Sequence, residues 1–546
     1  MRVAEAVGAE LHRQGVECVF GVVGSGNFDV TDALRRSGAR FVAARHECAA
    51  VCMADAYARV SGTVGVASVH QGPGLTNAIT GLTEAAKAHT PLLLLAADVS
   101  PTGRQLNFRI DQAGLAAAVG AVSERLEVPD RAPPDAVRAY RRAAEERRAV
   151  VLSMPLDVQA AEIDDMVSSL PSGQRQPVGP DPEAVTAVAD LLAAARRPVI
   201  LAGRGAVLSG AGPALEALGE RTGALLATSA NGHGLFAASP WALGISGGFL
   251  SPEAVRLLAE SDLWLAFGAS LNAWTTRHGE LVGLARVAQV DCESEALGAH
   301  QPVDLAVEGD AAETARLLLE ELEHRGHRAE GYREAGRDTM IAAGRWRYQP
   351  YDDTSTGTSV DPRTLTIALE DLLPAERTLV IDSGAFMGWP AMYLSVPDAA
   401  GFVFNQAFQS IGLGLGAAIG AALARPDRLT VAAVGDGGAF MALGELETAA
   451  RLTLPLLVVI YNDAAYGAEV HHFGPQGKPL EIVRFPDTDF AALARASGAE
   501  GLTVRSVDDL AGVKDWLARR QGPLVVDAKV NPDVCGDWLV EAFRGH

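Results

Sequence analysis

Two acidic residues stand where short apolar runs end in the last third of the chain. Asp436 follows the apolar residues 429–434, and Asp463 closely follows residues 455–461. Each run is typical of a buried strand, and the segment between them has apolar residues at helical spacing, so we predict one β-α-β unit with parallel strands. If the strands are neighbours, the two carboxyl groups lie about 5–8 Å apart at one edge of the sheet. Two oxygen ligands there suit a hard cation such as Mg²⁺.

Glycines surround the first of these acidic residues. They let the backbone approach a diphosphate group closely, and the helix predicted after them offers its N-terminus to negative charge. The glycines are Gly435, Gly437 and Gly438. A Gly-Asp-Gly turn alone also fits an ordinary strand-to-helix turn with a capping Asp. The matching Asn-Asp pair at the end of the next run favours a site for a diphosphate and a metal ion.

This motif, followed after about 27 residues by an Asn-containing turn, resembles the diphosphate and Mg²⁺ signature of thiamine diphosphate enzymes. The chain resembles in particular the acetolactate synthase and benzoylformate decarboxylase family. The resemblance implies thiamine diphosphate as cofactor and Mg²⁺ held by Asp436, Asp463 and the main-chain carbonyl of Ala465. It also implies that Tyr466 and Gly467 continue the diphosphate-binding loop. The family has a second Asn where this chain has Asp463, so one ligand here carries an additional negative charge.

A glutamate in the N-terminal part fits a second requirement of this chemistry, a proton relay. Residues 45–62, RHECAAVCMADAYARVSG, resemble the family helix that carries the catalytic glutamate, which gives Glu47 that role and a contact with the cofactor. A carboxyl group hydrogen-bonded to the aminopyrimidine promotes the tautomer that removes the proton from C2 of the thiazolium. Without the other motifs, Glu47 would be an ordinary glutamate favoured at a helix N-terminus.

Two further segments resemble family loops that contact the cofactor. Residues 408–420, FQSIGLGLGAAIG, resemble the segment that forces the two rings into a V, with Ile411 as the wedge and Gln409 beside it. Ser383 and Gly384, at the end of TLVIDSG, match the loop that reaches the aminopyrimidine. The glycines of 408–420 are also spaced like a dinucleotide-binding fingerprint, but they do not follow the first strand of their segment, as that fingerprint should.

The loop HQGPGLTN, residues 70–77, is expected beside the reacting carbon. Many acetolactate synthases have Thr-Ser where this chain has His70 and Gln71, whereas benzoylformate decarboxylase has a His at the position of His70. A histidine can donate or accept a proton near neutral pH, so we expect His70 and Gln71 to be catalytic. The alternative is that His70 only caps the end of a strand.

Several positions are candidate substrate contacts. Asn107 takes the place of a family Gln when IDQ, residues 110–112, anchors the comparison. In the helix expected after the metal loop, polar residues replace apolar family residues, and one His stands where acetolactate synthases have a Trp that selects the second substrate. The candidates are Gly26, Asn107, Ala468, Glu469 and His472. On the helix after the metal loop, the polarity of Glu469, His471 and His472 predicts either a polar pocket or an exposed surface.

The elements that must position these residues alternate regularly along the chain. Apolar runs alternate with helical segments in three stretches, which predicts an α/β fold of three doubly wound parallel-sheet domains. We expect a thiamine pyrimidine-binding domain at 1–165, a central domain at 184–325 and a diphosphate- and Mg²⁺-binding domain at 361–535. The polar residues 171–183 and 326–360 are the expected linkers.

The resemblance also bears on assembly and on a second cofactor. Because Glu47 and the Gly-Asp-Gly motif fall in different predicted domains, which family enzymes pair across subunits, it implies a homodimer or homotetramer with active sites between subunits. Residues 268–279, GASLNAWTTRHG, differ from the stretch associated with flavin in acetolactate synthases, so we do not expect FAD.

Composition excludes several classes of protein. The 546 residues carry a formal net charge of −21 without a run of Lys or Arg, which disfavours binding to nucleic acid. The five cysteines are scattered without a CxxC pair, so neither a disulfide framework nor a zinc site is expected. The N-terminus lacks an apolar signal core, and the longest apolar run, 91–97, is too short to span a membrane. We therefore expect a cytoplasmic protein.

These observations predict a thiamine diphosphate-dependent 2-oxo acid decarboxylase or carboligase, which takes a small 2-oxo acid and a carbonyl acceptor, with acetolactate chemistry as the first expectation. A benzoylformate decarboxylase-like decarboxylase or a carbon–carbon lyase is the alternative. An alternative of another class is a non-catalytic, cofactor-binding regulatory subunit, which the presence of Glu47 disfavours. The hypothesis of a nicotinamide dehydrogenase is supported only by isolated glycine motifs.

Overall fold

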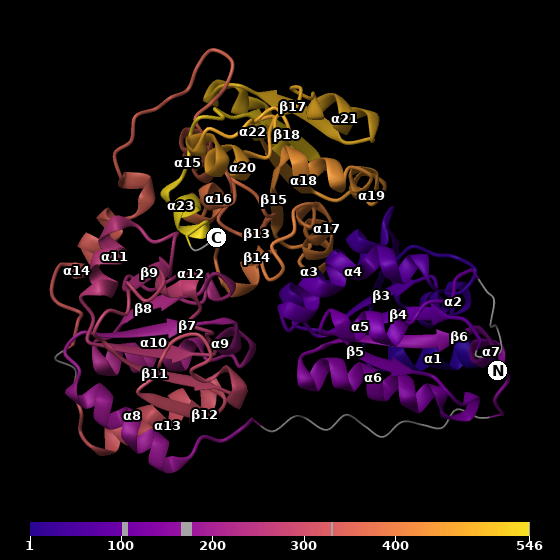
Figure 1. Cartoon of the computed structure of the whole chain (residues 1–546), viewed down its shortest axis with the longest axis horizontal. Helices are drawn as coiled ribbons and strands as arrows, with labels where there is room; N and C mark the ends of the chain where they lie inside the picture. Colours follow the sequence, from indigo (N-terminus) through magenta and orange to yellow (C-terminus); the bar gives the residue numbers. More distant parts are fainter. Residues whose placement is uncertain (101–106, 165–176, 329–330, 545–546) are drawn as a thin grey trace.

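The chain forms three α/β units, each built on a six-stranded parallel sheet (Figure 1). The computed structural model describes residues 1–100, 107–164, 177–328 and 331–544. The three sheets confirm the predicted fold class. All five cysteines are free. Within the described ranges, no helix is long and apolar enough to cross a membrane.

The first sheet has the strand order β2-β1-β3-β4-β6-β5. Its central strands are continuous apolar runs because helices cover both faces of a parallel sheet, and every residue of β4 is buried. The strands are β1 (Cys18–Gly21), β2 (Arg40–Ala43), β3 (Gly65–Val69), β4 (Leu92–Asp98), β5 (Val122–Arg125) and β6 (Ala149–Pro155). The helices are α1 (Val3–Arg13), α2 (Phe28–Ser37), α3 (Glu47–Ser61), α4 (Pro73–Lys87), α5 (Gln112–Ala118), α6 (Ala132–Glu146) and α7 (Leu156–Ala160), with a 3₁₀ turn η1 (Pro129–Arg131).

The second sheet has the strand order β12-β11-β10-β7-β8-β9. Successive strands are therefore added first on one side of β7 and then on its other side. The strands are β7 (Pro198–Ala202), β8 (Leu225–Thr228), β9 (Ala242–Ile245), β10 (Leu263–Phe267), β11 (Arg286–Asp291) and β12 (Leu305–Glu308). The helices are α8 (Pro182–Ala194), α9 (Arg204–Leu208), α10 (Gly212–Thr222), α11 (Pro252–Ala259), α12 (Ala273–Thr276) and α13 (Ala311–His324), with 3₁₀ turns η2 (Ala230–Gly232) and η3 (Ser294–Ala296).

The third sheet has the order β14-β13-β15-β16-β18-β17. The strands are β13 (Arg377–Ile381), β14 (Phe402–Phe404), β15 (Leu429–Gly435), β16 (Leu456–Asn462), β17 (Glu500–Val504) and β18 (Leu524–Lys529). The helices are α15 (Pro362–Leu372), α16 (Gly388–Tyr393), α17 (Gly414–Ala424), α18 (Asp436–Met441), α19 (Glu445–Arg451), α20 (Gly467–Phe473), α21 (Phe490–Ala496), α22 (Ala511–Arg519) and α23 (Asp537–Ala542), with 3₁₀ turns η5 (Ala399–Gly401), η6 (Gly474–Gln476) and η7 (Val507–Leu510). The segment between β15 and β16, which its apolar spacing predicts as one helix, is divided into α18 and α19.

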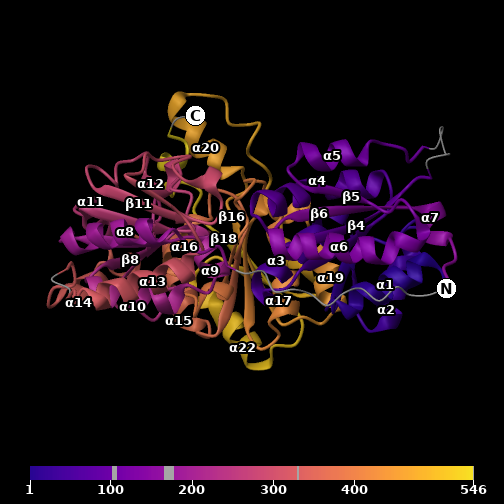
Figure 2. The same cartoon turned by 90° about the horizontal axis from the view of Figure 1, so that it is seen from below.

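Helices α3 and α17 join the first unit to the third (Figure 2). Their side chains share one hydrophobic core that includes Ala50, Met53 and Ile419. The backbones approach closely because α17 has glycines at the contact: a Cβ on Gly420 would lie 2.0 Å from the carbonyl oxygen of Met53. Small residues thus allow the first and third units to pack as one body.

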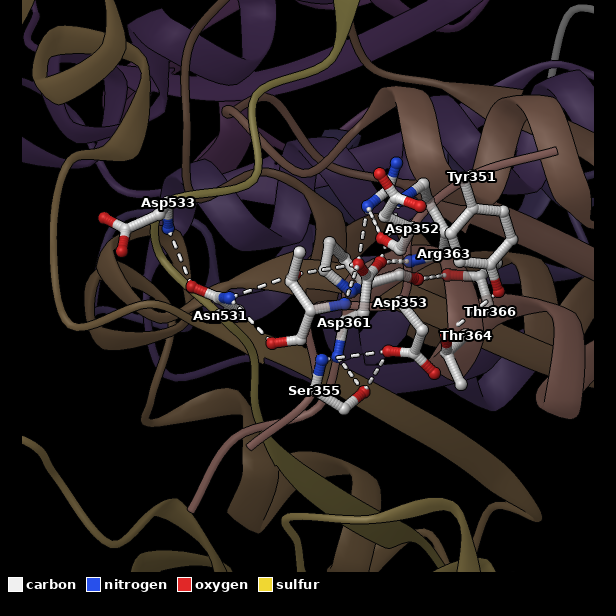
Figure 3. A network of polar contacts seen from close by, with 12 residues as sticks. Tyr351, Asp352, Asp353, Ser355, Asp361, Arg363, Thr364, Thr366, Asn531 and Asp533 are labelled. Atoms are coloured by element: carbon white, nitrogen blue, oxygen red, sulfur yellow. Dashed lines mark hydrogen bonds and ion pairs between the residues drawn. The ribbon is translucent and has the colours of Figure 1, made fainter. Parts of the chain in front are cut away.

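The segment before the third unit is held on it by a polar network (Figure 3). The expected linker 326–360 contains α14 (Arg337–Ala343) and the 3₁₀ turn η4 (Trp346–Tyr348). Farther along, the buried Asp361 carboxylate accepts hydrogen bonds from the backbone N–H and the hydroxyl of Thr354, at 3.2 and 3.0 Å. Asn531, just after β18, donates to the carbonyl and hydroxyl oxygens of Thr354, both at 3.0 Å. These bonds fix the linker against the segment that follows β18.

Candidate active site

Two neighbouring strands of the third sheet bring the predicted metal ligands together. Strands β15 and β16 are parallel and paired, with Gly435 opposite Tyr461, which confirms that they are neighbours. Asp436 begins α18 directly after β15, and Asp463 follows the end of β16 at the same edge of the sheet. A crossover between parallel strands produces this arrangement because it returns the chain to the same end of the sheet.

The two carboxyl groups interact in a buried setting. Burial raises the pKa of Asp436, and the charge of Asp463 raises it further. Burial likewise raises the pKa of Asp463. A divalent cation between them would offset both the burial and the repulsion, so this donor set fits Mg²⁺. The described residues include no group of three or more His, Cys, Asp and Glu side chains that could hold a metal ion, so further ligands would come from the main chain, a diphosphate or water.

Glycines form a cradle around this pair. A Cβ on Gly437 would lie 2.7 Å from the ring of Tyr466, and one on Gly467 would lie 2.2 Å from Oδ2 of Asp463. A Cβ on Gly438 would likewise come within 2.6 Å of a carboxylate oxygen of Asp382. Side chains at these positions would clash, and the bare backbone leaves N–H groups at the start of α18 accessible to an anion. The cradle therefore fits a diphosphate.

Asn462 holds the turn that follows β16. Its Oδ1 accepts the N–H of Ala464 at 3.1 Å, and its Nδ2 donates to Oδ1 of Asp527 at 2.9 Å. Ala464 has a φ of 55°, a left-handed conformation that a non-glycine residue adopts only at a cost. The N–H of Ala465 donates to Oδ1 of Asp463 at 3.2 Å. The carboxyl group and the following turn are thus fixed relative to each other.

Asp382, which the sequence motifs do not single out, ties two predicted cofactor loops together. It is buried and accepts hydrogen bonds from the N–H groups of Ser383, Gly412 and Leu413, at 2.9, 2.9 and 3.1 Å. Burial raises its pKa to about 6 despite these bonds. The hydroxyl of Ser383 lies 3.4 Å from the carbonyl oxygen of Gln409. Asp382 therefore holds the Ser383 loop against the loop that carries Gln409.

A cavity of about 840 Å³ opens beside the two aspartates. The predicted residues that line it are Ser383, Gly384, Gln409, Ile411, Gly435, Asp436, Gly437, Gly438, Asp463, Ala465, Tyr466, Gly467, Ala468 and Glu469. The structure thus gathers the predicted diphosphate, metal and wedge residues, and two of the substrate candidates, around one space. Its volume lies in the range usual for cofactor sites.

Other parts of the chain also line this cavity, and sequence reasoning missed them. From the second unit come Asn272, Trp274 and His278, at and near α12. From the C-terminal segment around α23 come Glu541 and Arg544. The ring nitrogen Nε2 of His278 lies 3.7 Å from a carboxylate oxygen of Glu541. None of these residues belongs to a recognisable motif, because long-range packing alone brings them to the cavity.

His472, the remaining candidate on α20, does not line the cavity. Its ring stacks on Phe543 with the ring centroids 4.2 Å apart and contacts Phe473 edge-on. The neighbouring His471 does line the cavity, and burial lowers its pKa. Phe543 of the C-terminal segment thus packs on His472, the residue that the sequence predicts as a substrate contact.

A second group of predicted residues lies on the first unit. The backbone N–H of Gly26 donates to Nδ1 of His70 at 3.2 Å, which leaves the proton of the neutral ring on Nε2. Burial lowers the pKa of His70, and the charge of Glu47 partly opposes this. Asn77 donates to a carboxylate oxygen of Glu47 at 3.1 Å. These contacts place the expected proton-transfer groups in one neighbourhood.

Gln71 and Asn107 differ in their surroundings. The side chain of Gln71 is buried, and its Oε1 has no hydrogen-bond partner among the described residues. It packs so closely on Gly26 that a Cβ there would lie 1.8 Å from this oxygen. Asn107 is exposed, and the ring of Phe108 beside it lies edge-on to His70 at 5.0 Å. The amide oxygen of Gln71 is therefore enclosed against Gly26 without a hydrogen-bond partner among the described residues.

The predicted residues of the first unit do not line this cavity. None of Glu47, His70, Gln71, Gly26 and Asn107 lines the cavity beside Asp436. The cavity group comes from the second and third units, whereas the proton-transfer group belongs to the first.

Comparison with known proteins identifies the family of the three units. Residues 1–115 match the N-terminal TPP-binding domain of thiamine pyrophosphate enzymes, residues 185–318 match their central domain, and residues 382–528 match their C-terminal TPP-binding domain.

Several relatives align with nearly the whole chain. A probable 2-ketoarginine decarboxylase of Pseudomonas aeruginosa is 33% identical over 92% of this chain and 89% of its own length. A sulfoacetaldehyde acetyltransferase of Rhodobacter capsulatus is 30% identical over 93% and 90%. A catabolic acetolactate synthase of Raoultella terrigena is 29% identical over 98% and 96%.

Fold and matched domains define a thiamine diphosphate-dependent enzyme with an N-terminal TPP-binding domain, a central domain and a C-terminal TPP-binding domain. The chain belongs to the thiamine pyrophosphate enzyme family, in the group that includes acetolactate synthase and related decarboxylases. Such enzymes act on small molecules.

Proposed function

We propose that this enzyme requires Mg²⁺ together with thiamine diphosphate, removes CO₂ from a 2-oxo acid and transfers the remaining acyl unit to a carbonyl acceptor. The observation that supports this most strongly is the buried pair Asp436 and Asp463 beside the glycine cradle and the cavity. When bound, thiamine diphosphate supplies a carbon nucleophile that adds to the 2-oxo group and accepts the electron pair left by CO₂.

In this proposal the chain's residues bind and orient. Asp436, Asp463 and the carbonyl of Ala465 hold Mg²⁺, and the cradle holds the diphosphate. Gln409 and Ile411, with Ser383 and Gly384, shape the space for the two rings. Glu47 keeps a proton in exchange with the aminopyrimidine, in the role that the family resemblance implies.

A simple decarboxylase is a second candidate, because one observation favours it. His70 has its proton on Nε2, and burial lowers its pKa, so the neutral ring can donate a proton where an acyl unit would otherwise be transferred. The names of the relatives include both outcomes, an acetyltransferase and a synthase on one side and a decarboxylase on the other.

The separation of the two groups of residues supports an active site shared between subunits. We propose a homodimer, alone or within a tetramer, in which Glu47 of one subunit faces the cavity of the other. A complete site would then need two chains, as in an isologous dimer.

Replacement of Glu47 tests the proposed function. We expect Glu47→Gln to lower CO₂ release from a panel of 2-oxo acids by at least about 10²-fold, because the proton relay is lost. This variant should still bind thiamine diphosphate with Mg²⁺, which is measured by the quenching of tryptophan fluorescence. The exposed Glu183 of α8 provides the control variant Glu183→Gln, which should match the unchanged enzyme. Full activity of Glu47→Gln would disprove the mechanism.

Replacement of His70 separates the two candidate reactions. If His70 donates the final proton, His70→Ala should lower aldehyde formation by about 10²-fold while CO₂ loss in a single turnover persists. If transfer to a carbonyl acceptor dominates, the ligated product should persist in this variant. Mass spectrometry of the products, with and without an added aldehyde or 2-oxo acid acceptor, distinguishes the two results.

A further inference from the structure

Two buried glutamates accept hydrogen bonds across the contact between the first and third units. Glu84 lies on α4 of the first unit, and Glu445 begins α19 of the third. Each residue is 1% exposed. Charged groups are rarely buried to this extent unless they are paired, so their partners define what they do.

Glu445 holds the start of the helix that carries Glu47. One carboxylate oxygen, Oε1, accepts the backbone N–H groups of Arg45 and His46, at 2.9 and 3.0 Å. The next residue is Glu47, the first residue of α3. The third unit therefore fixes the backbone of the two residues directly before the proposed proton relay.

Glu84 makes the reverse contact, because it belongs to the first unit and accepts hydrogen bonds from the third. Its Oε1 accepts the N–H of Ala407 at 3.1 Å, and its Oε2 accepts the N–H of Phe408 at 2.7 Å. The next residue is Gln409, which has a φ of 62°, and the proposed wedge Ile411 follows two positions later. The first unit therefore fixes the two residues directly before the proposed ring-binding loop of the third.

Further contacts stiffen both junctions. The buried Arg59 guanidinium pairs with Glu84 at 3.2 Å and with Asp55 at 2.9 Å, and it donates to the carbonyl oxygen of Phe404 at 3.2 Å. On the other side, Arg451 of α19 donates to the carbonyl oxygen of Ala43 at 2.6 Å. Hydrogen bonds from backbone N–H groups to a buried carboxylate are strong, and loss of the acceptor leaves the donors unsatisfied.

We propose that Glu84 and Glu445 are reciprocal positioning residues, each of which holds the segment of the other unit that contacts the cofactor. This rests on the proposed function, because it takes Glu47, Gln409 and Ile411 as cofactor contacts. Catalytic geometry is sensitive to displacements of about 1 Å, which cost up to about 10²-fold in rate. The two glutamates thus make correct packing of the units a condition for a competent site.

The proposal predicts a different defect for each glutamate. Glu445→Ala should lower kcat at least about tenfold with little change in the Kd of thiamine diphosphate, because only the helix that carries Glu47 is released. Glu84→Ala should raise that Kd at least about tenfold, because the ring-binding loop is released.

Conservative variants sharpen the test. In Glu445→Gln a single carbonyl oxygen can still accept both N–H groups, so kcat should recover to within about threefold of the unchanged enzyme. Glu84 uses both of its oxygens, so Glu84→Gln keeps only one acceptor and should recover only part of the cofactor affinity.

Matched controls exclude a general loss of stability. Leu446→Ala removes a buried side chain from the same helix, α19, without removing the acceptor, and Glu447→Gln changes the neighbouring surface ion pair with Arg45. Neither should reproduce the kcat defect of Glu445→Ala when all variants are compared at temperatures well below their Tm. The same kcat loss in Leu446→Ala, or an unchanged kcat in Glu445→Ala, would overturn the proposal.

Amide hydrogen exchange distinguishes this proposal from the proposed function. In the full-length protein without cofactor, Glu445→Ala should speed exchange in a peptide containing residues 45 and 46, and Glu84→Ala should do so for residues 407 and 408. Unchanged exchange would overturn the positioning roles whatever the enzyme catalyses. Faster exchange together with full activity of Glu47→Gln would instead overturn the proposed function alone.

Discussion

Asp463 stands where the family signature that this chain resembles has a second Asn. It adds a second carboxyl group beside Asp436 at the edge of one sheet, and burial raises the pKa of both. A bound divalent cation turns that repulsion into attraction. We therefore expect the stability of the protein to depend more strongly on Mg²⁺ than an Asn at this position would allow.

Replacement by the family residue tests this expectation. Without metal, Asp463→Asn should raise the Tm at neutral pH, because it removes one of two buried like charges. With Mg²⁺ and thiamine diphosphate, the unchanged protein should gain more in Tm than the variant. Thermal unfolding with and without Mg²⁺ measures both effects, and Asp515→Asn on the exposed face of α22 is the control. A lower Tm of the metal-free Asn variant would contradict the expectation.

The same pair predicts how stability depends on pH. A carboxyl group whose pKa is raised by folding destabilises the folded state when it is charged. In the metal-free protein, the stability that Asp436 and Asp463 contribute should therefore be present at low pH and be lost as pH rises above the ordinary carboxyl pKa. Thermal unfolding from about pH 4 to about pH 8 should show a fall that Mg²⁺ reduces and that Asp463→Asn diminishes.

Among the elements, α3 and α17 determine how the first unit meets the third. The apolar side chains of α17 are buried almost all around the helix, so its sequence carries no clear amphipathic pattern. Its glycines allow contact with the backbone of α3, and α3 begins with Glu47. The packing of these two helices therefore bears directly on where the proposed proton relay lies.

Substitution at the helix contact should destabilise the protein. A Cβ on Gly420 would lie 2.0 Å from the carbonyl oxygen of Met53, so Gly420→Ala should lower the free energy of unfolding by about 1–3 kcal/mol, although alanine favours helix. Chemical denaturation measures the change. A Cβ on Gly357 would meet open space, so Gly357→Ala should change the free energy of unfolding by less than about 0.5 kcal/mol. Equal effects of the two substitutions would contradict this account of the contact.

At the scale of the whole molecule, the fold divides the predicted site residues into two groups, one at the cavity and one around Glu47. The cavity belongs to the second and third units, and the group around Glu47 belongs to the first. The active site that we propose between two subunits would bring both groups together.

Complementation between inactive variants tests the shared site. Glu47→Gln and Asp436→Ala should each be inactive alone. After equal amounts are dissociated and reassociated, half of the dimers are mixed, and each mixed dimer has one intact site, so activity should reach about a quarter of that of the unchanged enzyme. Size-exclusion chromatography confirms the assembly. If each chain carried its own site, mixing would restore no activity.

Much of the site could be predicted from local sequence. An apolar run followed by Gly-Asp-Gly identifies a strand end, and a second run ending in Asn462-Asp463 identifies its neighbour. The topology of a β-α-β unit then requires both ends to lie at one edge of the sheet. The fold class followed in the same way from alternating strands and helices. These features are determined by short-range chemistry and by a connection rule that holds for nearly all parallel sheets.

Only the tertiary structure decided which distant residues complete the site. His278 and Glu541 at the cavity, Asp382 between the loops, and Glu84 and Glu445 between the units have no spacing or motif that would have identified them. Their partners lie tens to hundreds of residues away along the chain, up to 400 for Glu445 and Arg45. Such contacts arise from the packing of whole units, in which each residue's role depends on geometry that no single segment contains.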